Sequence, residues 1–364
     1  MSHTQTHTPV LRPRACDLLA WYDAHARTLP WRSAPGEATD PYRIWLSEIM
    51  LQQTTVAAAR PYFESFVAKW PDISALAAAA EDRVLAAWAG LGYYARARNL
   101  IRCAAHVAGK YGGRFPTSEE KLLTLPGIGP YTAAAIAAIA FGRRAVVVDG
   151  NVERVMARLM AVKTPLPGAK PELRRLAATL TPRTRPGDYA QAVMDLGATV
   201  CRPKTPLCHL CPWAPPCRAR AAGIAGELPI RAKKRVKPVR YGVAFWVQTQ
   251  GGQVLLRRRP DKGLLGAMTE IPSTEWKGAP WGAADARLAA PLVADWQPVS
   301  TGIRHVFTHF SLELTLWKAM LSGEVELREN AAPERCRWVA LADLEGEALP
   351  SVMRKIVAAA RLEL

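Results

Sequence analysis

The sequence predicts a multi-domain protein in which an all-α N-terminal region is followed by an α+β C-terminal region. Residues 1–225 contain Ala-rich stretches such as "ISALAAAAEDRVLAAWAG" that alternate with Pro and Gly, a composition that favours closely packed helices. From residue 241 the pattern is that of strands, and "YGVAFWVQTQGGQVLLRRR" predicts two strands around a Gly-Gly turn. Between the two regions, residues 226–240 ("GELPIRAKKRVKPVR") carry six basic side chains and two prolines. We expect an exposed linker there, which either follows a phosphate backbone or serves only as a solvated tether.

Length and charge restrict the class of protein. The 364 residues suffice for two domains with their own cores. The 48 Lys and Arg against 31 Asp and Glu give a formal net charge of +17, which favours nucleic acid as partner before an anionic membrane. No apolar run has the length of a membrane span, and the N-terminal "MSHTQTHTPVLRPRAC" lacks the apolar core of a secretory signal. We therefore expect a cytoplasmic protein without a membrane partner.

A single carboxylate lies inside the helical pattern "RIWLSEIMLQQT". On a helix the nearest neighbours of Glu48 are Ile44, Trp45, Leu51 and Gln52, and three of these four are apolar. A carboxylate among apolar side chains is costly unless it has a partner or a task. Such surroundings predict a raised pKa, which suits a general acid.

Four of the seven cysteines lie within one short segment, "CRPKTPLCHLCPWAPPC". Four thiolates on one segment can ligate one metal centre, and both zinc and a [4Fe–4S] cluster accept four cysteines. Zinc sites more often use two separated C-x-x-C pairs, whereas the spacings here are six, two and five residues. The candidate ligands are Cys201, Cys208, Cys211 and Cys217.

The stretch "LTLPGIGPYTAAAIAAIAFG" predicts a tight turn between two helices. Gly127 and Gly129 permit positive-φ geometry, and Pro130 is well suited to the first turn of the second helix. A Gly-rich turn at a helix N-terminus presents free backbone N–H groups to phosphate, although an ordinary helical hairpin has the same pattern.

An apolar run in "AVVVDGNVERVMARL" ends at Asp149, where the next helix is expected to start. A helix cap is the common task of Asp at such a position. A second carboxylate of an active site is the other interpretation.

Taken together, these motifs resemble a known family. The cysteine spacing is similar to the iron–sulfur loop of the endonuclease III and MutY glycosylases, and "LPGIG" to the helix-hairpin-helix motif of DNA repair enzymes. "WLSEIMLQQT", "GLGYYARARNL", "LPWR", "DPYRIW" and "MDLGATVC" resemble MutY-type adenine DNA glycosylases, and the resemblance covers the whole chain. It implies a monomeric base-excision repair enzyme that carries a [4Fe–4S] cluster and associates with the nucleoid through DNA. Its substrate would be double-stranded DNA containing adenine mispaired with 8-oxoguanine or guanine.

The resemblance also implies an architecture. The helical region would form a six-helix lobe at about 35–142 and an iron–sulfur lobe from the N-terminus and about 143–225, with Asp149 at the seam. Residues 241–364 resemble the Nudix-like domain that MutY proteins append.

The resemblance assigns roles to three residues in catalysis. Glu48 would protonate adenine at N7, and Asp149, among backbone donors, would stay ionised and stabilise the oxocarbenium-like state. Glycosylases that also cut the strand carry a lysine where this chain has Tyr131. Without that amine no Schiff base forms, so a monofunctional enzyme is implied.

Further positions are assigned by resemblance to contacts with DNA or with the flipped adenine. Tyr93 matches the aromatic wedge next to 8-oxoguanine, although a core tyrosine is an alternative. Gln191 matches a residue that contacts adenine. The other positions are Trp31 and Arg32 at the pocket, Gln53 and Thr54 facing the opposite strand, and Gly127 and Gly129 in the hairpin.

The C-terminal region departs from the family in one loop. The Phe-Ser-His loop that contacts 8-oxoguanine is here Phe307-Thr308-His309, in which threonine keeps the hydroxyl and adds a methyl group. "GLLGAMTEIPSTEW" has only scattered acids, so no Mg²⁺-dependent nucleotide hydrolysis is expected.

Three other functions compete with an adenine glycosylase. An endonuclease III-like glycosylase with lyase activity conflicts with Tyr131 and with the second domain. A non-catalytic iron–sulfur DNA-binding protein has no need for both Glu48 and Asp149. A Nudix hydrolase with a DNA-binding appendage conflicts with the scattered acids.

Overall fold

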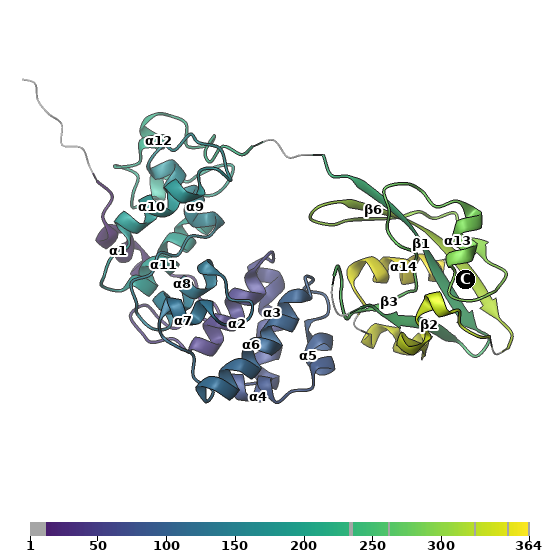
Figure 1. The fold of residues 1–364 in the computed structure, drawn as a ribbon. Helices are drawn as coiled ribbons and strands as arrows, with labels where there is room; N and C mark the ends of the chain where they lie inside the picture. The colour runs from purple at the N-terminus through teal and green to yellow at the C-terminus, as the bar shows by residue number, and fades with distance from the viewer. Residues whose placement is uncertain (1–11, 233–235, 261–262, 324, 348, 363–364) are drawn as a thin grey trace, which may run out of the picture. The chain divides into compact units, whose positions relative to one another are not determined.

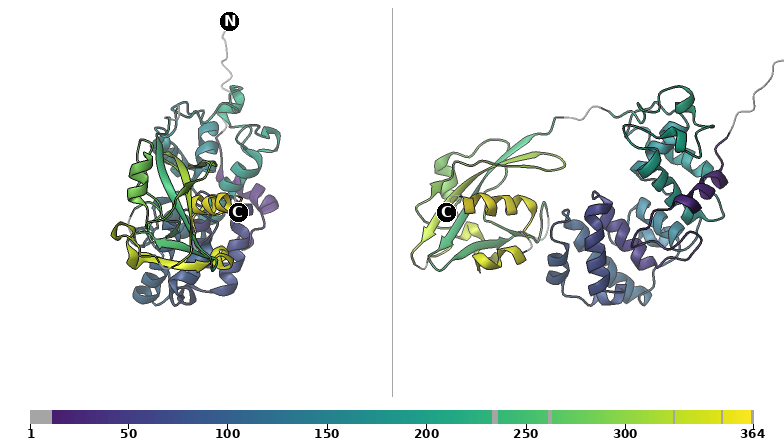
Figure 2. Two further views of the ribbon diagram at one scale, coloured as in Figure 1. Left: turned by 90° about the vertical axis from the view of Figure 1, so that its right-hand side faces the viewer. Right: turned by 180° about the vertical axis from the view of Figure 1, so that it is seen from behind.

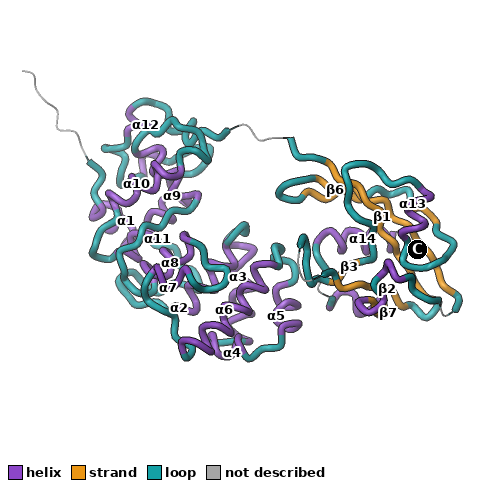
Figure 3. Tube along the Cα trace, viewed as in Figure 1, coloured by secondary structure: helices purple, strands orange, loops and turns teal. Residues whose placement is uncertain are grey.

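The chain folds as two compact units. The first contains Met1–Ala79 and Asn99–Lys233, and the second contains Ala80–Arg98 and Lys234–Leu364. Helices make up the first unit, and all the described strands belong to the second (Figures 1 and 3). The computed structural model describes residues 12–232, 236–260, 263–323, 325–347 and 349–362.

The segment Ala80–Arg98, which we expect inside the six-helix lobe at about 35–142, lies in the second compact unit. Part of the linker predicted at 226–240 is bonded to the first unit. The Leu166 amide donates to the Ile230 carbonyl at 2.8 Å, and the Ala232 amide donates to the Leu166 carbonyl at 3.0 Å. These bonds attach the chain up to Ala232 to the first unit. Lys233, Lys234 and Arg235 of the basic run lie outside the described residues.

Short polar side chains start many of the helices. The side chains of Asp40, Thr55, Asp72, Ser118 and Asp149 accept backbone N–H bonds at the first turns of α2, α3, α4, α7 and α9. The helices of the first unit are α1 (Ala15–His25), α2 (Pro41–Leu51), α3 (Val56–Lys69), α4 (Ile73–Ala77), α7 (Glu119–Leu123), α8 (Pro130–Ile139), α9 (Gly150–Leu159), α10 (Lys170–Leu180), α11 (Pro186–Asp195) and α12 (Arg218–Ala221), with a π-helical turn η1 (Leu196–Val200) and a 3₁₀ turn η2 (Cys208–Leu210). Helix α5 (Glu81–Trp88) belongs to the second unit, and α6 (Ala95–Tyr111) begins there and continues into the first.

The Ala-rich helix α8 lies at the centre of the first unit and packs against α2, α7 and α11. Its small side chains from Ala133 to Ala138 are almost fully buried, which lets neighbouring helices approach closely. A Cβ placed on Gly187, in the first turn of α11, would lie 2.6 Å from the Ala138 carbonyl oxygen. Both α2 and α11 therefore pack closely against one thin helix.

The second unit is built on a seven-stranded sheet in which β1 and β6 are long and parallel (Figures 1 and 2). The main strand order is β3-β2-β1-β6-β4, with β5 paired to β6 and β7 to β2. Its elements are β1 (Val239–Thr249), β2 (Gln253–Arg258), β3 (Thr269–Glu270), α13 (Ala283–Ala289), β4 (Gln297–Pro298), β5 (Ile303–Val306), β6 (Ser311–Leu321), η3 (Glu329–Ala331), η4 (Pro333–Arg335), β7 (Cys336–Ala340), η5 (Leu341–Gly346) and α14 (Ser351–Leu362).

Alternation along β1 supplies two separate apolar layers. Ala244 and Trp246 belong to the core that includes α14, whereas Val243, Phe245 and Val247 belong to the core that includes α13. Alternate side chains of β1 point to opposite faces of the sheet, and each face packs against a helix. The predicted strand pair around the Gly-Gly turn and the predicted C-terminal helix are confirmed.

Among the described helices, none combines the length and apolar character required to cross a membrane.

The turn between α7 and α8 generates a stability prediction. Gly127 has φ +76°, and an added Cβ would lie 2.6 Å from the Cβ of Asn99, whereas the space around Gly129 is open. We expect Gly127→Ala to lower the free energy of unfolding by about 1–3 kcal/mol, because both strain and overlap must be relieved. Gly129→Ala, with φ −94°, is the matched control and should change it little. Urea unfolding followed by circular dichroism checks this, and equal midpoints for the two variants would contradict it.

Candidate active site

The first unit encloses a cavity of about 640 Å³ that collects most of the predicted site residues of the helical region. It is bounded by α2, by the segment before α2, by the first residues of α8 and α9, and by α11. The predicted residues that line it are Trp31, Arg32, Glu48, Gln53, Thr54, Tyr131, Asp149 and Gln191. Residues separated by up to 160 positions in the chain therefore share one cavity wall.

Glu48 is buried on α2 and faces this cavity, with only 8% of its surface exposed. Ile44 and Leu51, predicted as its apolar neighbours, line the cavity beside it. Burial raises the pKa of Glu48 from its ordinary 4.5 to about 7. A hydrogen bond with Tyr131 lowers it, and the nearby charge of Asp149 raises it. The carboxyl is therefore half-protonated near neutral pH, as a general acid requires.

Tyr131 stands in the first turn of α8, directly after Pro130. Burial and the neighbouring carboxylates hold the pKa of its phenol well above the ordinary value, so the hydroxyl stays protonated. Gln191 is buried on α11 and presents its amide to the same cavity. At the end of α2, Gln53 has φ +63°, a strained conformation that leaves its side chain exposed at the cavity.

Asp149 is the N-cap of α9, as the sequence predicts. Its Oδ1 accepts from the Val152 amide at 2.7 Å, and its Oδ2 accepts from Asn151 Nδ2 at 2.9 Å. Burial raises the pKa of Asp149, and these hydrogen bonds oppose that rise. Both partners are donors that cannot accept a proton, so the arrangement suits a carboxylate rather than a carboxylic acid.

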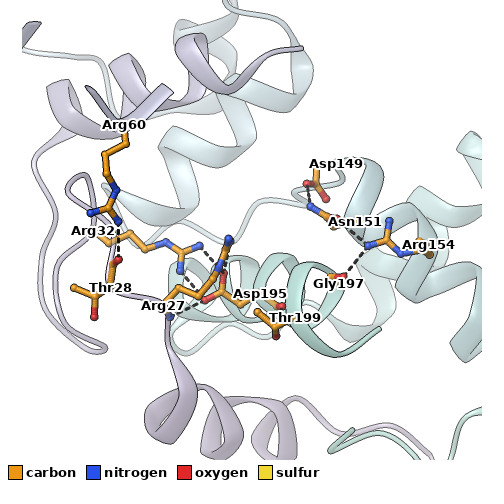
Figure 4. A network of polar contacts seen from close by, with 10 residues as sticks. All are labelled: Arg27, Thr28, Arg32, Arg60, Asp149, Asn151, Arg154, Asp195, Gly197 and Thr199. Atoms are coloured by element: carbon orange, nitrogen blue, oxygen red, sulfur yellow. Dashed lines mark hydrogen bonds and ion pairs between the residues drawn. The ribbon is translucent and has the colours of Figure 1, made fainter. Parts of the chain in front are cut away.

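A chain of hydrogen bonds connects Asp149 to the cysteine segment. Arg154 Nη2 donates to Asn151 Oδ1 at 2.9 Å and to the Gly197 carbonyl at 2.7 Å (Figure 4). Arg154 Nε donates to the Cys201 carbonyl at 2.8 Å. One guanidinium therefore joins the cap of α9, the π-helical turn η1 and the first cysteine.

A second network, which the sequence does not reveal, joins Asp195 to two arginines (Figure 4). Asp195 at the end of α11 is fully buried and forms ion pairs with Arg27 at 2.6 Å and Arg32 at 2.7 Å. Burial disfavours its charge, but the hydrogen bonds and charges of the two arginines outweigh burial and lower the pKa of Asp195. Both arginines line the cavity.

The four predicted cysteine ligands follow η1, lie in or directly after η2, and precede α12, and the other three act on Cys211 through their charges. Burial is the main cause that raises the pKa of Cys211 to about 12, and the other three cysteines add to the rise through their charges. The buried guanidinium of Arg158 donates to the Cys201 sulfur at 3.3 Å and to the carbonyls of Arg202 and Pro203 at 2.6 and 2.7 Å. The side chain of Arg158 thus fixes the first three residues of the cysteine segment, 201–203.

The thiolates of these four cysteines suit either zinc or an iron–sulfur cluster. In the described part of the chain, no group of three His, Cys, Asp or Glu side chains is arranged to hold one metal ion. Zinc would draw four sulfurs to about 2.3 Å from one point, whereas each thiolate of a [4Fe–4S] cluster binds a different iron. Four half-buried free cysteines next to one another would be stabilised as thiolates by such a cationic group.

In the second unit, the "GLGYY" turn leaves one tyrosine exposed and buries the other. Tyr93 has φ +50° and is 54% exposed, whereas Tyr94 is 6% exposed. The alternative of a core tyrosine therefore applies to Tyr94. Within the same unit the Tyr93 hydroxyl lies 3.4 Å from Thr308 Oγ1.

The predicted Phe307-Thr308-His309 loop is the turn between β5 and β6. Thr308 and His309 are exposed, whereas Phe307 stacks on Phe310 with 4.8 Å between ring centres. The loop therefore presents a hydroxyl and an imidazole on an aromatic base. Nearby on β3, the buried Glu270 is paired with Arg257 and Arg259.

Sequence reasoning missed five residues of this site. They are Arg27, Asn151, Arg154, Arg158 and Asp195. Only Asp195 carried a readable signal, because it is a single carboxylate in the apolar context "AVMDLGATV", the same signal that singled out Glu48. The arginines and Asn151 lie on polar helix faces or loops, where nothing in the pattern separates a buried from a solvated side chain.

Comparison with known families assigns both units to domain types. A family described as HhH-GPD superfamily base excision DNA repair protein matches residues 46–182, and the NUDIX domain matches residues 243–359. A solved structure of a thermostable thymine-DNA glycosylase has a TM-score of 0.51 and 30% identity, covering 57% of this chain and 95% of that one. The predicted fold class, a helix-hairpin-helix region followed by a Nudix-like domain, is confirmed.

Curated relatives share most of the chain. The adenine DNA glycosylase of Homo sapiens is 35% identical over 401 residues, covering 93% of this chain and 72% of that protein. The adenine DNA glycosylase of Rattus norvegicus is 34% identical over 402 residues, covering 93% and 76%. The adenine DNA glycosylase of Mycolicibacterium smegmatis is 42% identical over 219 residues, covering 60% and 73%.

The raised pKa of Glu48 predicts a pH-dependent cost to stability. Below the ordinary pKa of 4.5, the Glu48 carboxyl is protonated in both the folded and the unfolded chain. Between pH 4.5 and about 7 the unfolded chain releases this proton while the folded chain keeps it, so the free energy of unfolding falls as pH rises. Glu48→Gln removes this cost. The change that it makes in the free energy of unfolding should therefore be more favourable at pH 8 than at pH 4.5, by up to about 3 kcal/mol, since a tenfold change in proton affinity is worth about 1.4 kcal/mol. Urea unfolding at both pH values checks this, with the exposed Glu64→Gln as control. A gain that is the same at both pH values would contradict it.

Proposed function

Because this chain belongs to the adenine DNA glycosylases of base-excision repair, we propose that it hydrolyses the N-glycosidic bond of adenine mispaired with 8-oxoguanine or guanine, in the cavity of Glu48. One observation carries the proposal: two carboxyl groups with opposite surroundings, Glu48 and Asp149, line the same cavity. Breaking this bond leaves negative charge on the departing base and positive charge on the sugar. A proton donor and a fixed anion are the two groups that such a reaction needs.

Glu48 acts as the general acid. Adenine must leave the base stack to reach a buried carboxyl, so the nucleotide is flipped into the cavity. Protonated Glu48 then donates to N7 of adenine, which converts the base into a neutral leaving group. Tyr131 holds the carboxyl by their hydrogen bond, and the Gln191 amide offers both a donor and an acceptor to the edge of the base.

Asp149 acts as the anion near the sugar. Its two hydrogen-bond donors, the Val152 amide and Asn151 Nδ2, keep the carboxylate ionised and fixed in place. A preorganised negative charge stabilises an oxocarbenium-like state without reorganisation. Glu48, once deprotonated, accepts a proton from the attacking water and orients it. Since Tyr131 offers no amine, the enzyme is monofunctional.

The remaining predicted residues position the DNA. The exposed Gln53 and the half-buried Thr54 follow α2 and face the strand opposite adenine. The hairpin of Gly127 and Gly129 offers backbone N–H groups to phosphate. Tyr93 inserts beside 8-oxoguanine, and the loop containing Thr308 contacts that base. The enzyme acts as a monomer.

Cys201, Cys208, Cys211 and Cys217 hold a [4Fe–4S] cluster. When bound, the cluster supplies positive charge that keeps the four thiolates together and orders their segment. The ordered segment presents Arg202 and Lys204, both exposed, to the DNA backbone. Its order also supports Arg154, and through it the cap at Asp149.

Adenine release from an 8-oxoguanine:adenine duplex under single-turnover conditions tests the proposed function. We expect Glu48→Gln to slow release by at least about 100-fold, because the proton donor is lost, and Asp149→Asn to slow it by a similar factor. For the wild type, the rate should fall as pH rises through about 7, where Glu48 loses its proton. Glu64→Gln, on the exposed side of α3, should match the wild type.

Two results would contradict this assignment. A wild-type rate in Glu48→Gln would exclude Glu48 as the acid. A wild-type chain trapped covalently on the DNA by borohydride would show lyase chemistry and exclude the monofunctional reaction.

Iron analysis tests the cluster. We expect about four irons per chain and visible charge-transfer absorbance in the wild type. Cys211→Ser should lose most of both, whereas Cys336→Ser, in β7 of the second unit, should retain them. Zinc in place of iron in the wild type, or full iron retention in Cys211→Ser, would contradict the assignment.

A further inference from the structure

Asp195 is the most deeply buried carboxylate of the first unit and contributes no atom to the cavity wall. Its side chain is fully inaccessible at the end of α11, and its chain neighbours Met194 and Leu196 are buried as well. An ionised carboxylate in such a place is costly unless charged donors surround it. Two arginines provide those donors, and both reach it from the segment before α2.

Both carboxylate oxygens of Asp195 accept hydrogen bonds from arginine residues. Arg32 donates from Nη1 and Nη2 to the two carboxylate oxygens at 2.7 and 2.9 Å, a bidentate pair (Figure 4). Arg27 donates from Nε at 2.7 Å and from its backbone amide at 3.1 Å. One carboxylate therefore fixes the position of both guanidinium groups and of the backbone at residue 27.

The same two arginines face the catalytic cavity. The charged and titratable side chains that line it with Glu48 are Arg27, Arg32, Tyr131 and Asp149. Arg32 lowers the pKa of Glu48 through its charge, which places the guanidinium within electrostatic reach of the acid. Because Asp195 neutralises one of the two positive charges, it also sets how much positive charge Glu48 experiences.

A break in helix geometry places Asp195 at this point. The α-helix α11 ends at Asp195 and the chain continues as the π-helical turn η1. Such turns are uncommon and often accompany functional sites. Within it, Gly197 lies against Asn151, where a Cβ would be 2.6 Å from the Asn151 Cβ, so η1 also contacts the residue that holds Asp149.

We propose that Asp195 is a positioning residue of this active site, which holds Arg27 and Arg32 against the adenine cavity and sets the net charge beside Glu48. The proposal rests on the proposed function, because its effect is transmitted through the general acid. Removing the negative charge at residue 195 leaves two positive charges near Glu48, which favours its ionised form. Glu48 then loses its proton at a lower pH, and adenine release declines at a lower pH.

The test measures single-turnover adenine release between pH 5.5 and 9 for Asp195→Asn. We expect a rate loss of about 100-fold, because the arginines are displaced. We also expect the alkaline midpoint, the pH at which the rate has fallen to half of its maximum on the alkaline side, to move to lower pH by roughly one pH unit. Asp195→Glu keeps the anion and should keep the wild-type midpoint whatever its rate. Asp188→Asn, on the first turn of the same helix, is the matched control and should also keep the wild-type midpoint.

A second variant covers the case in which Asp195→Asn does not fold, as judged by circular dichroism. Arg27→Gln removes a positive charge that is partly solvent-accessible, so it should fold and move the midpoint to higher pH, the opposite direction. An unchanged or lower midpoint in Arg27→Gln would overturn the proposal. A folded Asp195→Asn with the wild-type midpoint, at any rate, would overturn it as well. Failure of the proposed function is distinguished by the wild type itself, which would then release no adenine at any pH.

Discussion

Burial of the Glu48 carboxyl is the constraint on which the rest of the first unit depends. A carboxyl in an apolar wall keeps its proton near neutral pH, but only while neighbouring helices exclude water from it. The alanines of α8 let α2 approach closely, and the turn before α8 places Tyr131 on the carboxyl. The same burial costs stability whenever Glu48 is ionised, so the packed core around it must offset that cost.

The cysteine segment contributes to the site without touching the cavity. Arg154 and Arg158 both lie on α9, and both donate to the Cys201 carbonyl. Because Asp149 is the N-cap of α9, one short helix joins the predicted cluster loop at one face to the proposed catalytic anion at its N-terminus. Order in the loop and order at Asp149 are therefore parts of one hydrogen-bonded structure.

Sequence patterns identify the fold class and most of the residues that line the cavity, but not every boundary or buried partner. Glu48 is recognisable because a carboxylate interrupts an apolar period, Asp149 because it ends an apolar run, and the cysteines because of their spacing. The end of the linker is not recognisable, because Ile230 and Ala232 are held by backbone bonds to Leu166 that carry no side-chain signal. The same limit applies to Arg27 and Arg154, whose polar character is compatible with a solvated surface. Asp195 carries the same signal as Glu48, a single carboxylate in an apolar context.

Three carboxyl groups near one cavity thus acquire three different proton affinities from three kinds of partner. Glu48 shares a hydrogen bond with a phenol that itself stays protonated, so burial dominates and the pKa rises to about 7. Asp149 has an amide and a backbone N–H as donors, which oppose the effect of burial without reversing it. Asp195 has two guanidinium groups, and their charge reverses the effect of burial completely. Because each group is buried to a considerable extent, the partner rather than the exposure decides which carboxyl can donate a proton. Exchanging a neutral for a charged partner at any one of them would change the reaction that the cavity supports, even with the cavity's shape retained.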